Sequence, residues 1–255
     1  PPNSSSFSVS VVLPASGCEM IANVRRRAAS VETSDMGNRR QGAGKRQEGA
    51  NYTGTCLLTA SGRRARYPVA MSTYCDFAPG HPVHGPYHDH EYGVPTRDES
   101  ALFERLILEI NQAGLSWETI LKKRDGFQRA YSGFDVDAVA TYDDAERMRL
   151  LADPGIIRNR LKVDAAIHNA QAIRALRDSH GGFADWLDAH ALLDGTLRDR
   201  AAWVKLFKKS FRFTGGEIVG EFLMSLGYLP GAHRVDCPAH QRIVKLKPVW
   251  MQHPL

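Results

Sequence analysis

The sequence predicts an all-α domain of about 170 residues that begins near Met71. Three observations support this fold class. From Met71 onward, apolar residues recur with the spacing that places them on one face of a helix. Residues that favour helix N-caps precede several of these segments. Neither strands of alternating polarity nor internal repeats are found.

The first long helix is expected at residues 98–113, because Asp98 is a good capping residue and the apolar side chains that follow share one face. Those side chains are Leu102, Phe103, Leu106, Ile107 and Ile110. Further helices are expected at 143–151, 159–176, 182–193, 200–209 and 217–226. An Asp-Pro-Gly sequence at 153–155 separates the helices at 143–151 and 159–176, and residues 211–216 join the last two.

Residues 1–70 differ from the rest in composition and charge. They contain 10 Lys and Arg against 4 Asp and Glu, whereas the other 185 residues contain 23 against 24. This segment has no sustained periodicity, so we expect it to be disordered. It is interpreted either as sequence upstream of a natural start at Met71 or as an Arg-rich transit peptide. The net charge of +5 therefore says little about what the domain binds.

The domain is expected at residues 71–240, followed by a basic tail at 241–255 that either contacts nucleic acid or lies in solvent. The sequence has no apolar run of the roughly 18 residues that a membrane span requires, so a membrane protein is excluded. Its 4 cysteines are too few and too scattered for a disulfide scaffold. A reduced, cytoplasmic protein is expected, in which paired cysteines bind metal.

Two short segments contain candidate metal ligands. Cys75 and His88 lie near the start of the domain, and His233 and Cys237 lie four residues apart near its end. Zinc commonly binds two thiolates and two imidazoles, and a spacing of four lets one turn supply two ligands. The spacing is also compatible with surface histidines and an inert buried cysteine.

Two further features have both structural and functional interpretations. Glu109 lies at the edge of the apolar face of the helix at 98–113, so its carboxylate is either solvated or directed into a pocket. The glycines at 215–216 follow several basic residues, which is typical of a phosphate-binding turn but also of an ordinary interhelical turn.

Five segments of the chain, in the same order, resemble the DNA-3-methyladenine glycosylase I family. The resemblance extends from about Cys75 to Cys237, roughly two-thirds of the chain. The segments are YHDHEYGVP at 87–95, QAGLSWETILKKR at 112–124, GIIRNR at 155–160, FRFTG at 211–215 and GAHRVDC at 231–237. Five segments in register are far more specific than any one of them.

The resemblance implies a helix–hairpin–helix glycosylase fold with one structural zinc per chain, which joins the two ends of the domain. The zinc ligands implied are Cys75, His88, His233 and Cys237. Asp236 lies between His233 and Cys237 in the chain and is expected to orient a zinc ligand from the second coordination sphere.

The resemblance also implies how a damaged base is bound. Glu109 and Tyr87 would form hydrogen bonds to a purine flipped out of the duplex, while Trp117 stacks on its face. Phe77 stands where many relatives have Trp, and His84 where they tend to have Tyr, so these two positions are expected to alter selectivity.

The expected DNA contacts lie on two loops. Leu115 would be the wedge that fills the gap left by the flipped base. The amides of Gly215 and Gly216, together with Lys208 and Lys209, would contact phosphates.

The function implied is that of a monofunctional DNA glycosylase, a hydrolase that removes 3-methyladenine from alkylated double-stranded DNA as a monomer. The alternative is a zinc-stabilised helical DNA-binding protein without catalytic activity. A hydrolytic zinc enzyme ranks last, because four protein ligands leave no open coordination position.

Overall fold

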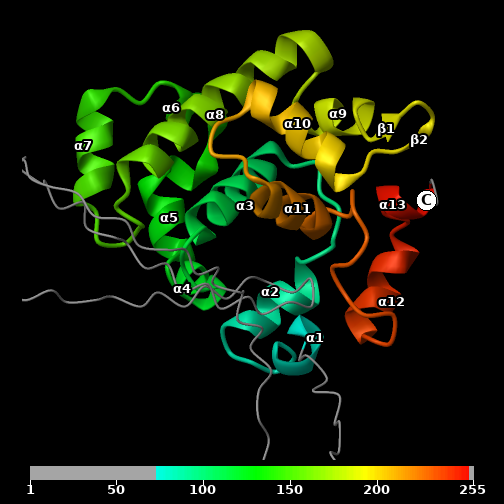
Figure 1. Ribbon diagram of the computed structural model, residues 1–255. Coiled ribbons are helices and arrows are strands. Elements are labelled where there is room, and N and C mark those ends of the chain that lie inside the picture. Colours follow the sequence, from blue (N-terminus) through cyan, green and yellow to red (C-terminus); the bar gives the residue numbers. More distant parts are fainter. Residues whose placement is uncertain (1–72, 253–255) are drawn as a thin grey trace, which may run out of the picture. The chain divides into compact units, whose positions relative to one another are not determined.

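Helices account for nearly all regular structure in the computed structural model, which describes residues 73–252 (Figure 1). The long helices are α3 (Glu99–Gln112), α7 (Asp144–Ala152), α8 (Arg160–His180), α10 (Arg200–Ser210) and α11 (Gly216–Ser225). The shorter ones are α1 (Tyr74–Phe77), α2 (His84–His90), α4 (Trp117–Lys122), α5 (Arg124–Ala130), η1 (Ser132–Phe134), α6 (Val136–Ala140), α9 (Phe183–Ala189), α12 (Pro238–Lys245) and α13 (Val249–Gln252). The all-α prediction is confirmed, apart from one small sheet.

The helix α3 lies in the core. The Asp98 side chain accepts a hydrogen bond from the Ala101 N–H at 2.7 Å, as a capping residue should. The five apolar side chains predicted to share a face are all fully buried. Helices α4, α8, α9 and α11 contact α3, and α11 lies against it near the centre of Figure 1. The helix that carries Glu109 is therefore held on several sides.

Capping side chains also define α7, α8 and α10. Asp143, Asn159 and Asp199 each accept a hydrogen bond from a first-turn N–H group. The helix α8 is longer than predicted and ends at Gly181, whose φ of 89° is the left-handed conformation that glycine adopts readily.

The predicted helix at 182–193 is too long, because α9 ends at Ala189. The residues that follow form an antiparallel hairpin of β1 (Leu192–Leu193) and β2 (Thr196–Leu197). The two residues between the strands, Asp194 and Gly195, both have positive φ. An Asp-Gly pair of this kind favours a tight hairpin turn, and that local preference ends the helix.

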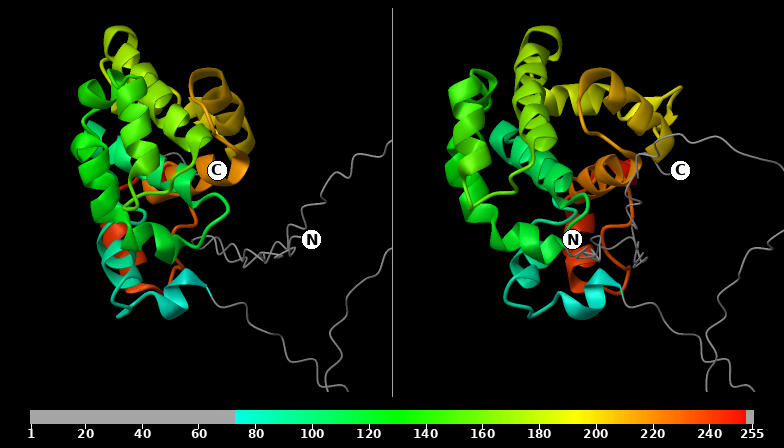
Figure 2. Two further views of the ribbon diagram at one scale, coloured as in Figure 1. Left: turned by 90° about the vertical axis from the view of Figure 1, so that its left-hand side faces the viewer. Right: turned by 60° about the vertical axis from the view of Figure 1, so that its left-hand side comes forward.

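The two ends of the described chain contain short helices that periodicity did not predict. Helices α2 and α12 contact each other, and Figure 2 shows α12 beside α1 and α2 in both views. The predicted domain boundary at residue 241 lies inside α12, where Ile243 is buried. The segment 1–70 lies outside the described residues. Among the described helices, none combines the length and the hydropathy needed to cross a membrane.

Candidate functional site

The four residues predicted as metal ligands lie together, although they come from opposite ends of the domain. The ligand atoms of Cys75, His88, His233 and Cys237 are all within 4.8 Å of one another. His233 Nδ1 is 3.2 Å from His88 Nε2 and 3.6 Å from Cys75 Sγ, while Cys237 Sγ is 3.8 Å from both imidazole nitrogens. This cluster could bind a metal ion.

Hydrogen bonds orient both imidazoles toward the centre of the cluster. His88 Nδ1 lies 2.8 Å from the Asp89 carboxylate, and His233 Nε2 lies 2.7 Å from the Tyr92 carbonyl oxygen. Donation of a proton by each of these nitrogens leaves His88 Nε2 and His233 Nδ1 with free lone pairs. Burial lowers the pKa of His233 to about 4, so this imidazole is neutral, as a metal ligand must be.

The support expected from Asp236 comes instead from Asp89. The carboxylate of Asp236 is exposed and pairs with Arg234 at 3.0 Å. Arg234 also contacts Asp76, which lies beside Cys75 in the chain. Arg234 therefore links the two ligand segments at the surface, while the Asp236 carboxylate pairs with Arg234 and orients neither imidazole.

A second group of predicted residues is buried where α2, α3 and α4 meet. The relative exposures of Glu109, Tyr87 and Trp117 are only 2%, 3% and 2%. The rings of Tyr87 and Trp117 are 5.0 Å apart at an interplanar angle of 63°. Glu109 is thus not a solvated residue at the edge of its helix.

Burial and neighbouring charges shift the pKa values of Glu109 and Tyr87 in this region. Burial raises the pKa of Glu109 well above its usual value, the negative charge of Glu221 raises it further, and Arg105 lowers it. Burial and Glu109 also raise the pKa of Tyr87, whose phenol therefore remains a hydrogen-bond donor. A positively charged ring placed here would favour the ionised form of Glu109 and face two aromatic side chains.

Tyr74, which no sequence pattern singled out, lies between this region and the metal cluster. Tyr74 is 3% exposed, and its ring makes edge contacts with Phe77, His84, His88 and Tyr92. Its hydroxyl lies 3.2 Å from His84 Nδ1. Phe77 is 41% exposed and therefore lies at the outer edge of this aromatic group. The position of Tyr74 beside the candidate ligand Cys75 was the available signal.

A buried hydrogen-bonded pair close to Glu109 was also not predicted from the sequence. The Tyr92 hydroxyl donates to Glu221 Oε2 at 2.9 Å, and both residues are essentially inaccessible. Because these residues lie 129 positions apart in the chain, no local pattern could have predicted the pair.

The candidate DNA contacts lie on two loops. Leu115 is half-buried and follows Gly114, whose φ is 87°. Lys208 and Lys209 are exposed in the last turn of α10. Gly215 precedes α11 without a capping side chain, and a Cβ atom at Gly215 or Gly216 would meet nothing within 4 Å. The backbone at this turn is therefore open to approach.

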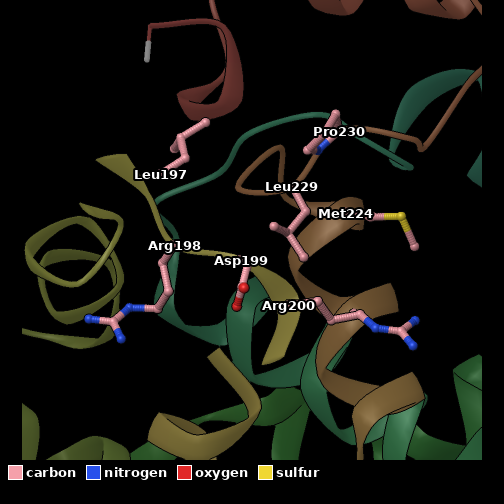
Figure 3. Close-up of a pocket in the computed structure, with 8 residues that line it drawn as sticks. Leu197, Arg198, Asp199, Arg200, Met224, Leu229 and Pro230 are labelled. Atoms are coloured by element: carbon pink, nitrogen blue, oxygen red, sulfur yellow. The ribbon is translucent and has the colours of Figure 1, made fainter. Parts of the chain in front are cut away.

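A surface pocket of about 250 Å³ lies away from the residues described above, between the start of α10 and the end of α11 (Figure 3). It is lined by Leu197, Arg198, Asp199, Arg200, Gly220, Met224, Leu229 and Pro230. Arg198 and Arg200 extend to opposite sides, where they bond the His190 carbonyl and Glu217, and Asp199 caps α10. None of the predicted site residues lines this pocket.

Comparisons with known proteins agree on one family. The methyladenine glycosylase family matches residues 78–240. DNA-3-methyladenine glycosylase 1 of Escherichia coli (strain K12) is 35% identical over 177 residues, which cover 64% of this chain and 94% of that protein. DNA-3-methyladenine glycosylase of Haemophilus influenzae is 32% identical over 182 residues, covering 66% and 98%.

Solved structures show the same similarity. A crystal structure of 3-methyladenine DNA glycosylase I aligns with a TM-score of 0.58 at 35% identity, covering 64% of this chain and 97% of that one. A structure of the Staphylococcus aureus enzyme, described as showing 3-methyladenine recognition, aligns with a TM-score of 0.58 at 33% identity, covering 65% and 95%.

Proposed function

Because the chain belongs to the methyladenine glycosylase family, we propose that it hydrolyses the N-glycosidic bond of 3-methyladenine in DNA. The observation that carries this proposal is the buried Glu109 carboxyl beside the rings of Tyr87 and Trp117. A solved relative, 32% identical, is described as a complex with 3-methyladenine.

The pocket distinguishes 3-methyladenine from adenine by charge. The methylated base in DNA is cationic, whereas adenine is neutral, so a carboxylate and an aromatic face favour the damaged base. Glu109 and Tyr87 form hydrogen bonds to the flipped base and Trp117 stacks on it. Phe77, at the exposed edge, completes the base contacts, and His84 acts on the selectivity for the base through its contact with Tyr74.

The chemistry requires little acid catalysis. Because the base already carries a positive charge, the bond between the sugar C1′ and the base nitrogen breaks with its electron pair leaving on a neutral base. Water then adds hydroxide to C1′ and releases a proton, which gives an abasic site. The role of Glu109 is to bind and orient the cationic base, so that C1′ is open to attack by water when the base leaves.

Two segments of the chain contact the DNA in this proposal. Leu115 fills the space left in the duplex by the flipped base. The turn between α10 and α11 acts as a helix–hairpin–helix element, in which the amides of Gly215 and Gly216 and the ammonium groups of Lys208 and Lys209 contact phosphates. The protein acts on double-stranded alkylated DNA as a monomer in the cytoplasm.

The metal cluster fits zinc. Zinc bonds of about 2.0–2.1 Å to nitrogen and 2.3 Å to sulfur place tetrahedral ligands about 3.3 Å apart for two nitrogens and about 3.6 Å apart for nitrogen and sulfur. The corresponding distances here are 3.2 Å, and 3.6 to 3.8 Å. Four protein ligands fill the coordination sphere, so the zinc supplies cohesion between the two ends of the domain rather than catalysis.

A base-release assay tests the activity. The whole chain is incubated with methylated duplex DNA, and the released bases are separated from the polymer. We expect 3-methyladenine in the soluble fraction and an equal number of abasic sites in the DNA. Binding to methylated DNA without release of base would contradict the proposal and support the non-catalytic DNA-binding alternative.

Replacing Lys208 and Lys209 with Ala should weaken binding to every duplex, damaged or undamaged, because phosphate contacts carry no information about the lesion. Removing two such contacts should also reduce the slope of log affinity against log salt by about 2. Binding titrations at several salt concentrations measure both effects. A matched control replaces Arg129 and Arg174, which are exposed on α5 and α8, with Ala. An equal loss in that control would show that net charge, and not the hairpin, determines affinity.

A further inference from the structure

A buried lysine lies between the two loops that are proposed to contact DNA. Lys162, near the start of α8, is only 5% exposed. Its ammonium group donates to the carbonyl oxygens of Asn111 at 2.8 Å and Ala113 at 2.7 Å. The same nitrogen lies 5.8 Å from the centre of the Phe213 ring. Lys162 thus contacts residues that lie 49 and 51 positions before it in the chain and one that lies 51 positions after it.

The two carbonyl acceptors belong to the end of the helix that carries the base-binding carboxylate. Asn111 is in the last turn of α3, and Ala113 is its C-cap residue. Carbonyl groups at a helix C-terminus lack partners within the helix, and a cation there also interacts favourably with the helix dipole. Asn111 lies two residues after Glu109, and Ala113 two residues before Leu115. Lys162 therefore fixes both the end of the helix and the start of the loop that carries the wedge.

The same face of α8 also contacts the turn at 211–216, which joins α10 to α11 and is called the Phe213 hairpin below. Phe213 has a φ of 59°, is 37% exposed and faces the Lys162 ammonium. Seven residues further along α8, the fully buried Asn169 makes two hydrogen bonds to the backbone of Arg212, accepting from its N–H at 2.8 Å and donating to its carbonyl at 3.1 Å. Residues seven apart lie on the same face of a helix. One face of α8 thus contacts both the turn at 211–216 and the end of α3.

Lys162 makes polar contacts at a buried position, where packing alone would favour an apolar side chain. Burial lowers the pKa of Lys162 to about 8, which reflects the cost of removing its charge from water. Two carbonyl oxygens and an aromatic face offset that cost. A side chain of similar length without charge could fill the same space, but it could not hold the two carbonyl groups in place.

We propose that Lys162 is a positioning residue that holds the Leu115 loop in register with the Phe213 hairpin, so that one duplex engages both at once. This inference rests on the proposed glycosylase function. The hairpin fixes the duplex through phosphates, and the wedge must then reach the base step beside the lesion. A small displacement of one loop relative to the other misplaces the wedge and the flipped base, and such displacements slow catalysis strongly.

The main test replaces Lys162 with Met, which keeps the length of the side chain and removes both the charge and the donors. We expect single-turnover excision of 3-methyladenine from duplex DNA to slow by about ten- to a hundredfold. The affinity for free 3-methyladenine and for undamaged duplex should each stay within about twofold, because the pocket and the phosphate contacts remain. A fluorescent 2-aminopurine placed beside an abasic-site analogue reports insertion of the wedge directly, and its signal should fall with the excision rate.

The matched control is Lys123→Met, since Lys123 also donates to a backbone carbonyl, that of Pro154 at 2.7 Å, but on an exposed surface. It should excise at the rate of the unmodified chain. Phe213→Leu provides a second test that does not disturb a buried charge, and should slow excision several-fold with unchanged affinity for the free base.

Three outcomes would overturn the inference. The first is a normal rate of excision by both Lys162→Met and Phe213→Leu. The second is normal insertion of the wedge by a Lys162→Met variant that excises slowly. The third is an equal loss of free-base affinity and of excision in Lys162→Met, which would mean that Lys162 supports only the base-binding residues. Failure of the unmodified chain to release 3-methyladenine would instead contradict the proposed function. The two failures are therefore distinguishable.

Discussion

Replacing Glu109 with Gln is expected to slow excision of 3-methyladenine by about ten- to a hundredfold, because a hydrogen bond to a charged partner contributes roughly 1.5–3 kcal/mol. Glutamine keeps the size of the side chain but cannot supply the negative charge that favours a cationic base. Affinity for undamaged duplex should hardly change, since Glu109 is 2% exposed and lies inside the domain. Single-turnover excision and duplex affinity, measured side by side, test both expectations.

Two further variants sharpen this test. Glu118→Gln is the matched control, because Glu118 lies one residue from Trp117 but pairs with Lys122 at the surface, and it should excise normally. Trp117→Ala should lose excision to a similar extent as Glu109→Gln, since stacking of a base on an aromatic ring is worth roughly 1–3 kcal/mol. If Glu109→Gln excises at the normal rate, or weakens undamaged DNA binding as much as the Lys208 and Lys209 changes do, the pocket assignment is wrong.

The sequence predicted the long helices well because local signals define them. Asp98 was predicted as a cap and is one, and the helices expected from residues 159 and 200 begin at Arg160 and Arg200, each after a capping side chain. In α3 the apolar spacing also identified the buried face. Where a prediction was wrong, a competing local signal was present. The Asp194-Gly195 pair favours a hairpin turn and ends the helix that was extended to residue 193.

The short helices at the two ends of the domain could not be predicted in the same way. Helices of four to eight residues, such as α1 and α12, contain too few turns for a periodic pattern. Their positions depend on contacts with each other and on the metal cluster. The spacing of His233 and Cys237 indicated a metal site only weakly. It was the resemblance to a family that joined them to Cys75 and His88, and the structure brings all four ligand atoms together.

The buried polar pairs could not be predicted from the sequence for a different reason. Tyr92 and Glu221, and Lys162 with Ala113, meet only after the chain has folded. Burial of such groups is costly unless they find partners, so their partners could be identified only in the folded structure.

Replacing Cys237 with Ser is expected to remove the metal and to unfold or strongly destabilise the whole domain. Structural zinc contributes an apparent free energy of about 10–16 kcal/mol in small zinc-binding domains, which is as large as the roughly 5–15 kcal/mol by which most domains are stable. Even a fraction of that loss would lower the thermal midpoint far more than the changes at Glu109 or Lys162. Elemental analysis should find one zinc per chain in the unmodified protein and much less in the variant, and thermal unfolding should show the loss of stability.

The matched control is Val235→Ala, which changes an exposed side chain in the same loop, 78% accessible, without touching a ligand atom. It should keep one zinc per chain and the normal thermal midpoint. A chelator should destabilise the unmodified chain and the control alike but have little further effect on Cys237→Ser, because that variant has already lost the metal. Folded, active protein that contains no zinc would contradict this assignment. So would a Cys237→Ser variant of normal stability, because α2 and α12 would then hold together without a metal between them.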